Sequence, residues 1–554
     1  MKFDIKSPDL YKRTEYRKKG YWGDATLGDF WNMAVLRAPE KIAVMDLQGV
    51  SYTYSELDKS AEKLAAYLRE NGIKPGDIVS FQLPGWSEFT LIYIACLKAG
   101  AIVNPILVCY RLKELTYILN KCKSKMFFCP KEYKNFDYMS LQNQLILQVK
   151  TLKQIIYVEK EKKSNGKNTL DWILMNYAAK PQICSRAADD IAAVLFTSGT
   201  EGNAKGVMLT HNNILASEKA FTASLHITEF DTLLLPAPTA HAIGFHHGVT
   251  AAFIVGARSV LQDHFQVKTT LELIAKEKCT YCFGPTPFVY DIVNILKKEK
   301  YDISSLQFFV CGGAVIPQYM FKAALDVGVK LIDIYGSTES VPHSIVSYDK
   351  NIHGGSMIGI ETKVVDEQHK EVPDGSEGEE ASRGPNVFVG YLREKKLTAL
   401  VLDDDGWYYS GDLCIKSNDG NIRITGRKKD IIIRGGENLS CTEIEHILQQ
   451  HPNVKESGVV GMPDERLGER ICAYVILYDL ETGLTVQEVQ KFFLEKEMTK
   501  AKCPERIEIV KNIPRTASGK IKKIILKQDI KNKVFAEKKE ITESLKKEGT
   551  CYAS

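Results

Sequence analysis

The segment AAVLFTSGTEGNAKGVMLTH, residues 192–211, gathers hydroxyl, glycine and lysine residues between two apolar runs. Backbone N–H groups of a glycine-rich turn bind anions, and the Lys205 ammonium adds a compact charge that suits a phosphate. A Walker A loop needs glycine at 204 and Ser or Thr at 206, where this chain has Ala204 and Gly206. The segment is therefore predicted to bind phosphate in a manner other than that of P-loop kinases and ATPases. Its remaining candidate residues are Thr197, Ser198, Gly199, Thr200 and Gly202.

Further polar segments follow it in a fixed order: PAPTAHAIGF (236–245), YGSTE (335–339), YYSGDL (408–413), GRKKDIIIRGGENLS (426–440) and PRTASGK (514–520). Together with the first loop they resemble the motifs of the adenylate-forming superfamily, which includes acyl-CoA synthetases, firefly luciferases and peptide-synthetase adenylation domains. The resemblance covers nearly the whole chain and is nearest to bacterial short- and medium-chain fatty acid CoA ligases. The stretches QLPGW, ACLKAGA and EEASRGPNVFVGY add to it.

The resemblance implies a two-step reaction that uses ATP, Mg²⁺ and coenzyme A. A carboxylate attacks the α-phosphate of ATP to give acyl-adenylate and pyrophosphate, and the CoA thiol then displaces AMP. No protein nucleophile is needed, because charge neutralisation and positioning supply the catalysis.

The family's nucleotide contacts map onto two parts of this chain. The 197–205 loop would hold the departing phosphates, and Tyr335 would stack on adenine. Thr338 would bond the α-phosphate, and Glu339, with Thr200, would bind Mg²⁺. Asp412 would accept both ribose hydroxyls. The other implied nucleotide-binding residues are Gly312, Gly313, Ala314, Asp333, Gly336, Ser337, Ile424 and Arg427.

The C-terminal motifs imply a moving domain. Lys520 resembles the adenylation lysine, which bridges the carboxylate and the α-phosphate while negative charge accumulates. Lys429 matches the family's hinge, and Gly435 and Gly436 match the lining of the CoA channel. Because Lys205 and Lys520 would act on one nucleotide, the C-terminal domain is expected to close over the site and to rotate between half-reactions.

The acid-binding residues are predicted from the segment PAPTAHAIGFHHG. His241 would lie near the substrate carboxylate, while Phe245, His246, Phe283 and Val310 would line the tail pocket. The segment contains no acidic residue, so an uncharged tail is favoured over an ammonium. The spacing H-x4-H-H is not a standard zinc pattern.

The elements that must position these residues alternate between strand and helix. Expected helices are 53–73, with Ser55 as N-cap, then 86–99, 268–278, 287–299 and 317–327; expected strands are 77–84, 100–106, 232–237, 280–283, 307–310 and 330–334. The alternation predicts an α/β fold of parallel-rich sheets covered by helices on both faces. The predicted domains are 1–427, with a β-rich subdomain over 355–427, and a mobile α+β domain over 428–554.

Composition excludes several classes of function. Seventy-three Lys and Arg balance 69 Asp and Glu, which gives no reason to expect nucleic acid. The N-terminus lacks the apolar core of a signal peptide, and no window reaches the length of a membrane span. The 13 cysteines show no CxxC pair. A cytoplasmic monomer or homodimer with reduced thiols is expected, with peripheral membrane contact open for the Lys-rich tail.

Two other readings are consistent with the same motifs. The pocket could instead take an aromatic, alicyclic or bile-type acid, with unchanged chemistry. The chain could also be an adenylate-binding protein that no longer catalyses, or a module that loads a carrier protein. The presence of Lys205, Glu339 and Lys520 together argues against an inactive binder, and no C-terminal segment resembles a carrier domain.

Overall fold

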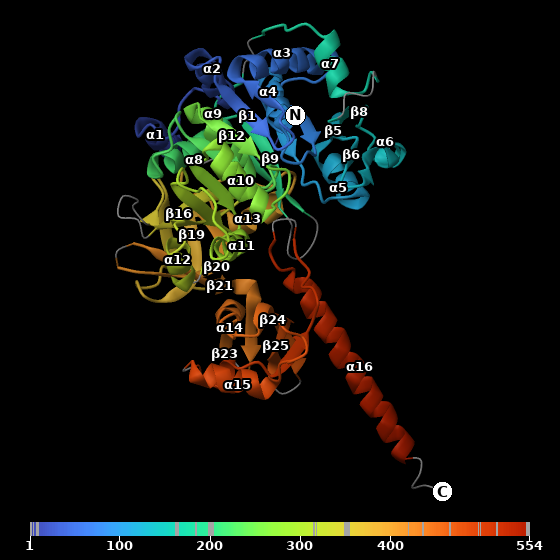
Figure 1. The fold of residues 1–554 in the computed structure, drawn as a ribbon, viewed down its shortest axis with the longest axis vertical. Coiled ribbons are helices and arrows are strands. Elements are labelled where there is room, and N and C mark those ends of the chain that lie inside the picture. Colours follow the sequence, from blue (N-terminus) through green and yellow to red (C-terminus); the bar gives the residue numbers. More distant parts are fainter. Residues whose placement is uncertain are drawn as a thin grey trace. The chain divides into compact units, whose positions relative to one another are not determined.

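The computed structural model describes two compact units (Figure 1). The described residues are 3, 5, 6, 10–160, 166–182, 186–197, 204–313, 316, 318–347, 355–418, 420–434, 437–464, 467–496, 498, 500–516 and 519–549. Unit 1 contains those in 1–199, 203–363 and 381–410, and unit 2 contains those in 364–380 and 411–554.

Unit 1 contains a nine-stranded sheet with the order β17-β16-β15-β14-β13-β11-β12-β1-β2. The neighbouring strands from β15 to β1 all run parallel, and antiparallel strands flank them on both sides. The strands are β1 (Ile42–Asp46), β2 (Ser51–Thr53), β11 (Thr232–Leu235), β12 (Arg258–Leu261), β13 (Tyr281–Gly284), β14 (Phe308–Gly312), β15 (Leu331–Ser337), β16 (Ser340–Ser347) and β17 (Gly355–Ser356).

A second sheet of unit 1 has the order β10-β9-β4-β3-β5-β8, parallel except for the pair β9–β10. Its strands are β3 (Ile78–Phe81), β4 (Ile102–Pro105), β5 (Met126–Pro130), β8 (Gln154–Val158), β9 (Ile191–Thr197) and β10 (Lys205–Thr210). A small hairpin adds β6 (Glu132–Tyr133) and β7 (Phe136–Asp137). The strands β3, β4 and β5 are buried along their whole length, as expected when helices cover both faces.

The helices of unit 1 connect and cover these strands. They are α1 (Leu10–Lys18), α2 (Leu27–Arg37), α3 (Tyr54–Glu70), α4 (Ser87–Ala99), α5 (Leu112–Cys122), η1 (Tyr138–Leu141), α6 (Gln142–Gln148), α7 (Leu170–Asn176), α8 (His211–Ser224), η2 (Gly244–Thr250), α9 (Ala251–Val255), α10 (Val267–Glu277), α11 (Thr286–Leu296), α12 (Gln318–Leu325) and α13 (Lys395–Val401). The alternation of strand and helix confirms the predicted α/β fold.

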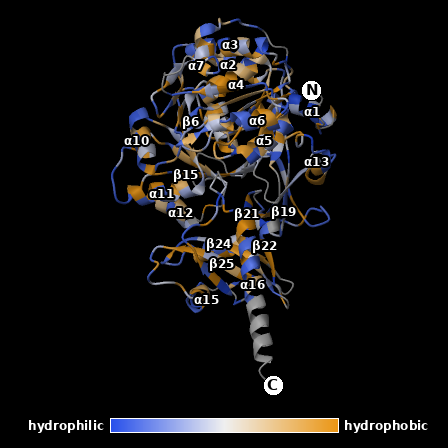
Figure 2. Cartoon of the chain, turned by 90° about the vertical axis from the view of Figure 1, so that its right-hand side faces the viewer, coloured by the Kyte–Doolittle hydropathy of each residue, from blue (hydrophilic) through white to orange (hydrophobic). Residues whose placement is uncertain are grey.

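Helices α3 and α4 show how the sequence sets these elements. A capping box begins α3: the Thr53 hydroxyl accepts from the Glu56 N–H, and the Glu56 carboxylate accepts from the Thr53 N–H. Ser55 was therefore the wrong N-cap. Helix α4 is apolar on nearly every side and almost wholly buried, and its hydrophobic colouring is visible in Figure 2.

A four-stranded sheet, β18-β19-β20-β21, follows, and the division between the two units runs through it. Its strands are β18 (Glu361–Val365), β19 (Glu377–Arg383), β20 (Tyr408–Lys416) and β21 (Ile422–Arg427). The expected β-rich texture after residue 355 is thus present. The domain limits at 427 and 428 stay a prediction.

The rest of unit 2 is built on a sheet with the order β23-β22-β25-β24, in which β26 also pairs with β25. Its elements are η3 (Lys428–Asp430), β22 (Ile431–Arg434), β23 (Glu437–Ser440), α14 (Cys441–Leu448), β24 (Val454–Asp464), β25 (Gly468–Leu477), α15 (Val486–Glu495), η4 (Lys500–Lys502), β26 (Arg506–Ile509) and α16 (Lys523–Gly549). Its core is formed by apolar residues of α14, α15 and the strands.

Two predictions about the whole chain can be compared with the described residues. Their cysteines are all free thiols, and only Cys109 is exposed, as the sequence predicts. Among the same residues, no helix combines the length and the apolarity that crossing a bilayer would require.

Candidate active site

Lys205, the lysine predicted to bind phosphate, lies on a strand. Thr197 ends β9 and Lys205 begins β10, and the two residues pair across the antiparallel hairpin. The Lys205 ammonium lies 5.2 Å from the centre of the Tyr391 ring, within the range of a cation–π interaction. The candidate loop residues Ser198, Gly199, Thr200 and Gly202 lie outside the described residues.

The predicted magnesium ligand occupies a tight turn. Thr338 and Glu339 connect β15 to β16, with Ser337 paired to Ser340. Glu339 is buried, and its Oε1 accepts a hydrogen bond of 2.8 Å from the Tyr391 hydroxyl. Tyr335, Gly336 and Ser337 precede the turn on β15, and the Ser337 hydroxyl lies 3.3 Å from that of Tyr408.

Tyr391 contacts both Lys205 and Glu339, and the sequence predicted no role for it. The Phe388 N–H donates to the Glu339 carbonyl at 2.8 Å, and the Leu392 N–H donates to the Gly206 carbonyl at 2.7 Å. An isolated β-bridge also pairs Tyr391 with Val207. The backbone of residues 388–392 therefore fixes the Tyr391 ring between Glu339 and Lys205.

The Tyr391 hydroxyl remains a proton donor. Burial, reinforced by the Glu339 carboxylate, raises the pKa of Tyr391 well above its ordinary value. The phenol therefore donates its hydrogen bond to Glu339 across the physiological pH range.

We expect Tyr391→Phe to weaken the proposed metal ligand without removing the ring beside Lys205. A hydrogen bond to a charged group contributes about 1.5–3 kcal/mol, so kcat should fall about 10-fold or more, with a higher Mg²⁺ concentration for half-maximal rate. Steady-state kinetics over a Mg²⁺ series measure both. Tyr301→Phe is the matched control, since Tyr301 donates to Glu299 at 3.0 Å on the surface. An unchanged Mg²⁺ dependence in Tyr391→Phe would contradict the assigned role.

Asp333 is a buried carboxyl group in the same strand. It pairs with Cys311 of β14. Burial raises the pKa of Asp333 to about 7, although a backbone hydrogen bond from Ile316 opposes the shift. The carboxyl group is thus poised near neutral pH, in the strand that leads to Tyr335.

This pKa predicts a pH-dependent stability. The unfolded carboxyl group titrates near 3.9. Between roughly pH 4 and 7 the folded state holds the proton that the unfolded state has lost, so stability falls as pH rises through this window. Asp333→Asn should therefore gain thermal stability relative to the original chain as pH goes from 5 to 8, in the absence of nucleotide. Melting temperatures that differ by the same amount at both pH values would rule out this titration.

The glycines predicted to lie beside the adenine are at the end of β14, where Gly312 is the last residue of the strand and Gly313 follows it. A Cβ on Gly312 would lie 3.0 Å from the Ile334 carbonyl oxygen, so the two strands approach closely there. Gly313 has φ +97°, a conformation that favours glycine. Ala314 lies outside the described residues.

The segment that carries the histidines begins in a turn and continues as a π-helix. The His241 N–H donates to the Pro238 carbonyl, and the Phe245 N–H donates to the His241 carbonyl. Gly244 is required, because a Cβ there would lie 2.2 Å from the Pro238 oxygen. The helix η2 then runs from Gly244 to Thr250 with π geometry. This geometry is rare in proteins, and where it occurs it is often found at a functional site.

The four predicted pocket residues are all buried in unit 1. Phe245 stacks on Tyr93 with ring centres 4.8 Å apart. Phe283 and Val310 are neighbours in the parallel strands β13 and β14. His246 lies next to a residue that the sequence analysis missed, the buried Glu218 of α8.

Glu218 holds two histidines at once. Its Oε1 lies 3.1 Å from the Nδ1 of His246, and its Oε2 lies 3.0 Å from the Nδ1 of His247. Burial by itself would raise the pKa of Glu218, but the two imidazoles lower it to about 2. Glu218 is therefore ionised at neutral pH. Among the described residues no group of three or more candidate ligands could hold a metal ion.

The ribose-binding candidates of unit 2 lie on one hairpin. Asp412 of β20 pairs with Arg427 of β21, and the Arg427 Nε lies 2.8 Å from Asp412 Oδ1. Asp412 is buried and Arg427 is nearly half exposed. Ile424 lies on β21 and is half-buried. Lys429 follows in η3, where only its backbone is described, and Gly435 and Gly436 lie outside the described residues.

Lys520 is exposed at the end of a short hydrogen-bonded loop of unit 2. Its N–H donates to the Thr516 hydroxyl, and the Thr516 N–H donates to the Lys520 carbonyl. Arg515, which the sequence analysis did not single out, donates to the Gly519 carbonyl and to the Glu456 carboxylate. The loop therefore ties Lys520 to strand β24, which carries Glu456.

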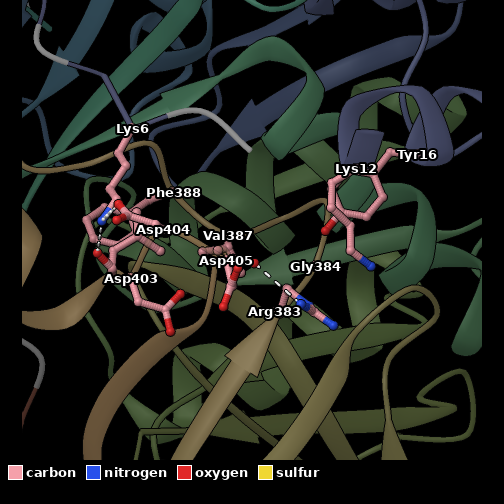
Figure 3. A pocket seen from close by; sticks show the side chains of 12 residues that line it. Lys6, Lys12, Tyr16, Arg383, Gly384, Val387, Phe388, Asp403, Asp404 and Asp405 are labelled. Atoms are coloured by element: carbon pink, nitrogen blue, oxygen red, sulfur yellow. Dashed lines mark hydrogen bonds and ion pairs between the residues drawn. The ribbon is translucent and has the colours of Figure 1, made fainter. Parts of the chain in front are cut away.

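A separate pocket of unit 1 lies outside these motifs (Figure 3). Lys6 pairs with Asp404 on one side of it, and Arg383 pairs with Glu361 beside the other. The charges of the pocket are thus largely compensated by residues of the chain, and the pocket is assigned no role.

Comparison with known proteins matches both parts of the chain. The family described as AMP-binding enzyme matches residues 31–392, and the AMP-binding enzyme C-terminal domain matches residues 443–520. The medium-chain fatty-acid–CoA ligase of Escherichia coli is 50% identical over 94% of this chain and 93% of its own length. The 2,3-dihydroxybenzoate-AMP ligase of Bacillus subtilis is 30% identical over 96% and 98%.

A solved structure shows the same architecture. ATP-bound MatB from Rhodopseudomonas palustris has a TM-score of 0.83 and 26% identity, over 92% of this chain and 99% of that one.

Proposed function

Because the chain belongs to the AMP-binding enzyme family, we propose that it is an AMP-forming acid–CoA ligase acting on short- to medium-chain fatty acids. The observation that carries the proposal is the 50% identity, over nearly the full length of both chains, to a medium-chain fatty-acid–CoA ligase. The arrangement of Lys205, Tyr391 and Glu339 adds to it. ATP and coenzyme A are the co-substrates, and a cytoplasmic monomer or homodimer stays part of the proposal.

In the first half-reaction an oxygen of the acid forms a bond to the α-phosphorus of ATP, and the bond from that phosphorus to pyrophosphate breaks. Lys205, the first residue of β10, places positive charge beside the leaving phosphates. Thr338, in the turn after β15, supplies a hydroxyl for the α-phosphate, and Tyr335 supplies the ring for adenine. Lys520 adds charge at the bridging oxygens, where negative charge accumulates.

In the second half-reaction the CoA sulfur attacks the acyl carbon, the thiol proton is lost, and AMP leaves. AMP is a far better leaving group than oxide, which is why the acid is first adenylated. Lys429, Gly435 and Gly436 remain the proposed hinge and channel residues.

A magnesium ion fits the donors near Glu339. This buried carboxylate accepts one hydrogen bond from Tyr391, and a carboxylate with phosphate oxygens forms the hard oxygen set that Mg²⁺ prefers. When bound, the ion would neutralise phosphate charge. Glu339, with Thr200, would hold it, and Tyr391 would orient the carboxylate.

An aromatic, alicyclic or bile-type acid is the alternative substrate for the same chemistry. The relative named as a 2,3-dihydroxybenzoate-AMP ligase supports the aromatic form of this alternative.

The test is acid-dependent release of AMP and pyrophosphate, with consumption of CoA, across saturated C4 to C16 acids, benzoate and cinnamate. Turnover that peaks among C4–C12 acids is expected. A preference for the aromatic acids would select the alternative, and release of ADP and orthophosphate would exclude both.

A further inference from the structure

The buried cluster of Glu218, His246 and His247 has hydrogen-bonding capacity that the fold does not use. Both Nδ1 atoms engage the same carboxylate, and the side chains of all three residues are at most 2% exposed. The Nε2 atoms of His246 and His247 are buried and lack a hydrogen-bond partner among the described residues. Buried polar atoms without partners are uncommon in native proteins and call for an explanation.

The hydrogen-bonding capacity of the cluster follows from this geometry. Glu218 is ionised, so each Nδ1 that faces it carries a proton and donates it. The Nε2 of such an imidazole accepts a hydrogen bond when the ring is neutral and donates one when the ring is charged. A hydroxyl group can both donate and accept, so it suits the unused Nε2 atoms in either state.

The position of the cluster connects it to the acid-binding residues. His247 stacks on Phe221 of α8 at 3.8 Å, and its ring centre lies 6.5 Å from that of Phe283. Phe283 is next to the last residue of β13, and in open α/β sheets ligands bind beyond the carboxyl ends of the strands. The histidines also share the π-helix that follows His241, the residue predicted at the substrate carboxylate. The cluster therefore follows the predicted carboxylate end within one continuous segment of the chain.

We infer that the His246–His247 pair binds a hydroxyl group carried by the far end of the acid, so that the preferred substrates are hydroxylated acyl chains. This inference rests on the proposed acid–CoA ligase function and narrows its substrate class. A plain alkyl end would leave both Nε2 atoms without water and without a hydrogen-bond partner, whereas a hydroxyl would form a hydrogen bond with one of them. A site that hydrogen-bonds a substrate hydroxyl discriminates strongly against the analogue that lacks it.

The test compares kcat/KM for ω-hydroxy acids with that for the matching unsubstituted acids from C4 to C12. At the chain length that reaches the cluster, the hydroxy acid should be preferred at least about 10-fold. His247→Phe keeps an aromatic ring on Phe221 but removes Nε2, and should abolish the preference. His247→Gln, whose amide group can donate and accept, should restore part of it. His264→Phe is the control, since His264 pairs with Asp263 at the surface and should keep the preference.

Each other outcome overturns the inference. Unsubstituted acids preferred at every length would show that the pocket end is apolar, and an ω-amino or dicarboxylic acid preferred instead would show a charge-selective site. A hydroxyl preference that persists in His247→Phe would place the hydroxyl elsewhere. In all three cases the ligase activity itself stands. Absence of AMP formation with every acid would instead refute the proposed function, and the inference with it.

Discussion

Replacing Lys520 by alanine is expected to lower acid-dependent ATP–pyrophosphate exchange by about 10³-fold or more, since the charge it supplies acts only while the adenylate forms. The rate of thioester formation from supplied acyl-adenylate and CoA should stay within about threefold of that of the original chain, because that step forms no bond to the α-phosphorus of ATP. The two half-reactions are measured separately, by isotope exchange and by thiol consumption.

The neighbouring Lys522→Ala is the matched control for the Lys520 prediction. Lys522 is exposed like Lys520 and directly precedes α16, so the variant removes one charge from the same part of the surface. It should retain both half-reactions. If Lys520→Ala impaired the two half-reactions equally, Lys520 would act in folding or domain placement and not in adenylation.

Replacing Glu339 by glutamine is expected to lower kcat/KM for ATP by about 10²–10³-fold, the range seen when one preorganised electrostatic contact at a reacting group is lost. The amide oxygen can still accept the Tyr391 hydrogen bond, so the turn between β15 and β16 should keep its shape. The missing charge would weaken the metal site, and higher Mg²⁺ should recover part of the rate. Pyrophosphate exchange over a Mg²⁺ series measures both effects.

A double-mutant cycle distinguishes this role from a general loss of structure. If Tyr391 acts through Glu339, Tyr391→Phe should cost little once Glu339 is glutamine, and the two effects should not add. If the effects of the two substitutions added fully, Tyr391 would not act through Glu339. A thermal midpoint far below that of the original chain in Glu339→Gln would point to folding as the cause.

The sequence predicted the elements well because their signals are local. Apolar periodicity marked α3, α10 and α11 within a few residues, and unbroken apolar runs marked the buried parallel strands. The N-cap of α3 was placed two residues late, at Ser55, although Thr53 and Glu56 already had the spacing of a capping box. The π geometry of η2 has no comparable signal, because it depends on what the helix packs against.

The site was less predictable where contacts are long-range. Glu218 precedes His246 by 28 residues and lies on another helix, so the histidine segment by itself showed no acid. Tyr391 follows Glu339 by 52 residues and ends the stretch EEASRGPNVFVGY, which resembles the family but by itself indicates no role for the tyrosine. Arg515 lies five residues before Lys520, but its contact with Glu456 requires the fold of unit 2. Residue type and spacing identified the charged groups, whereas their orienting partners required the structure.

The β9–β10 hairpin has a consequence for how such chains can diverge. Thr197 and Lys205 are paired strand residues, and residues 389–392 hydrogen-bond to β10 along its other side. The strands therefore set the position of Lys205, independently of the residues that connect them. In relatives, the connecting sequence 198–204 can be exchanged, lengthened or shortened while the strand pairing keeps the lysine in place. Variation in how the departing phosphates are held can thus arise by loop replacement, without any change to the sheet.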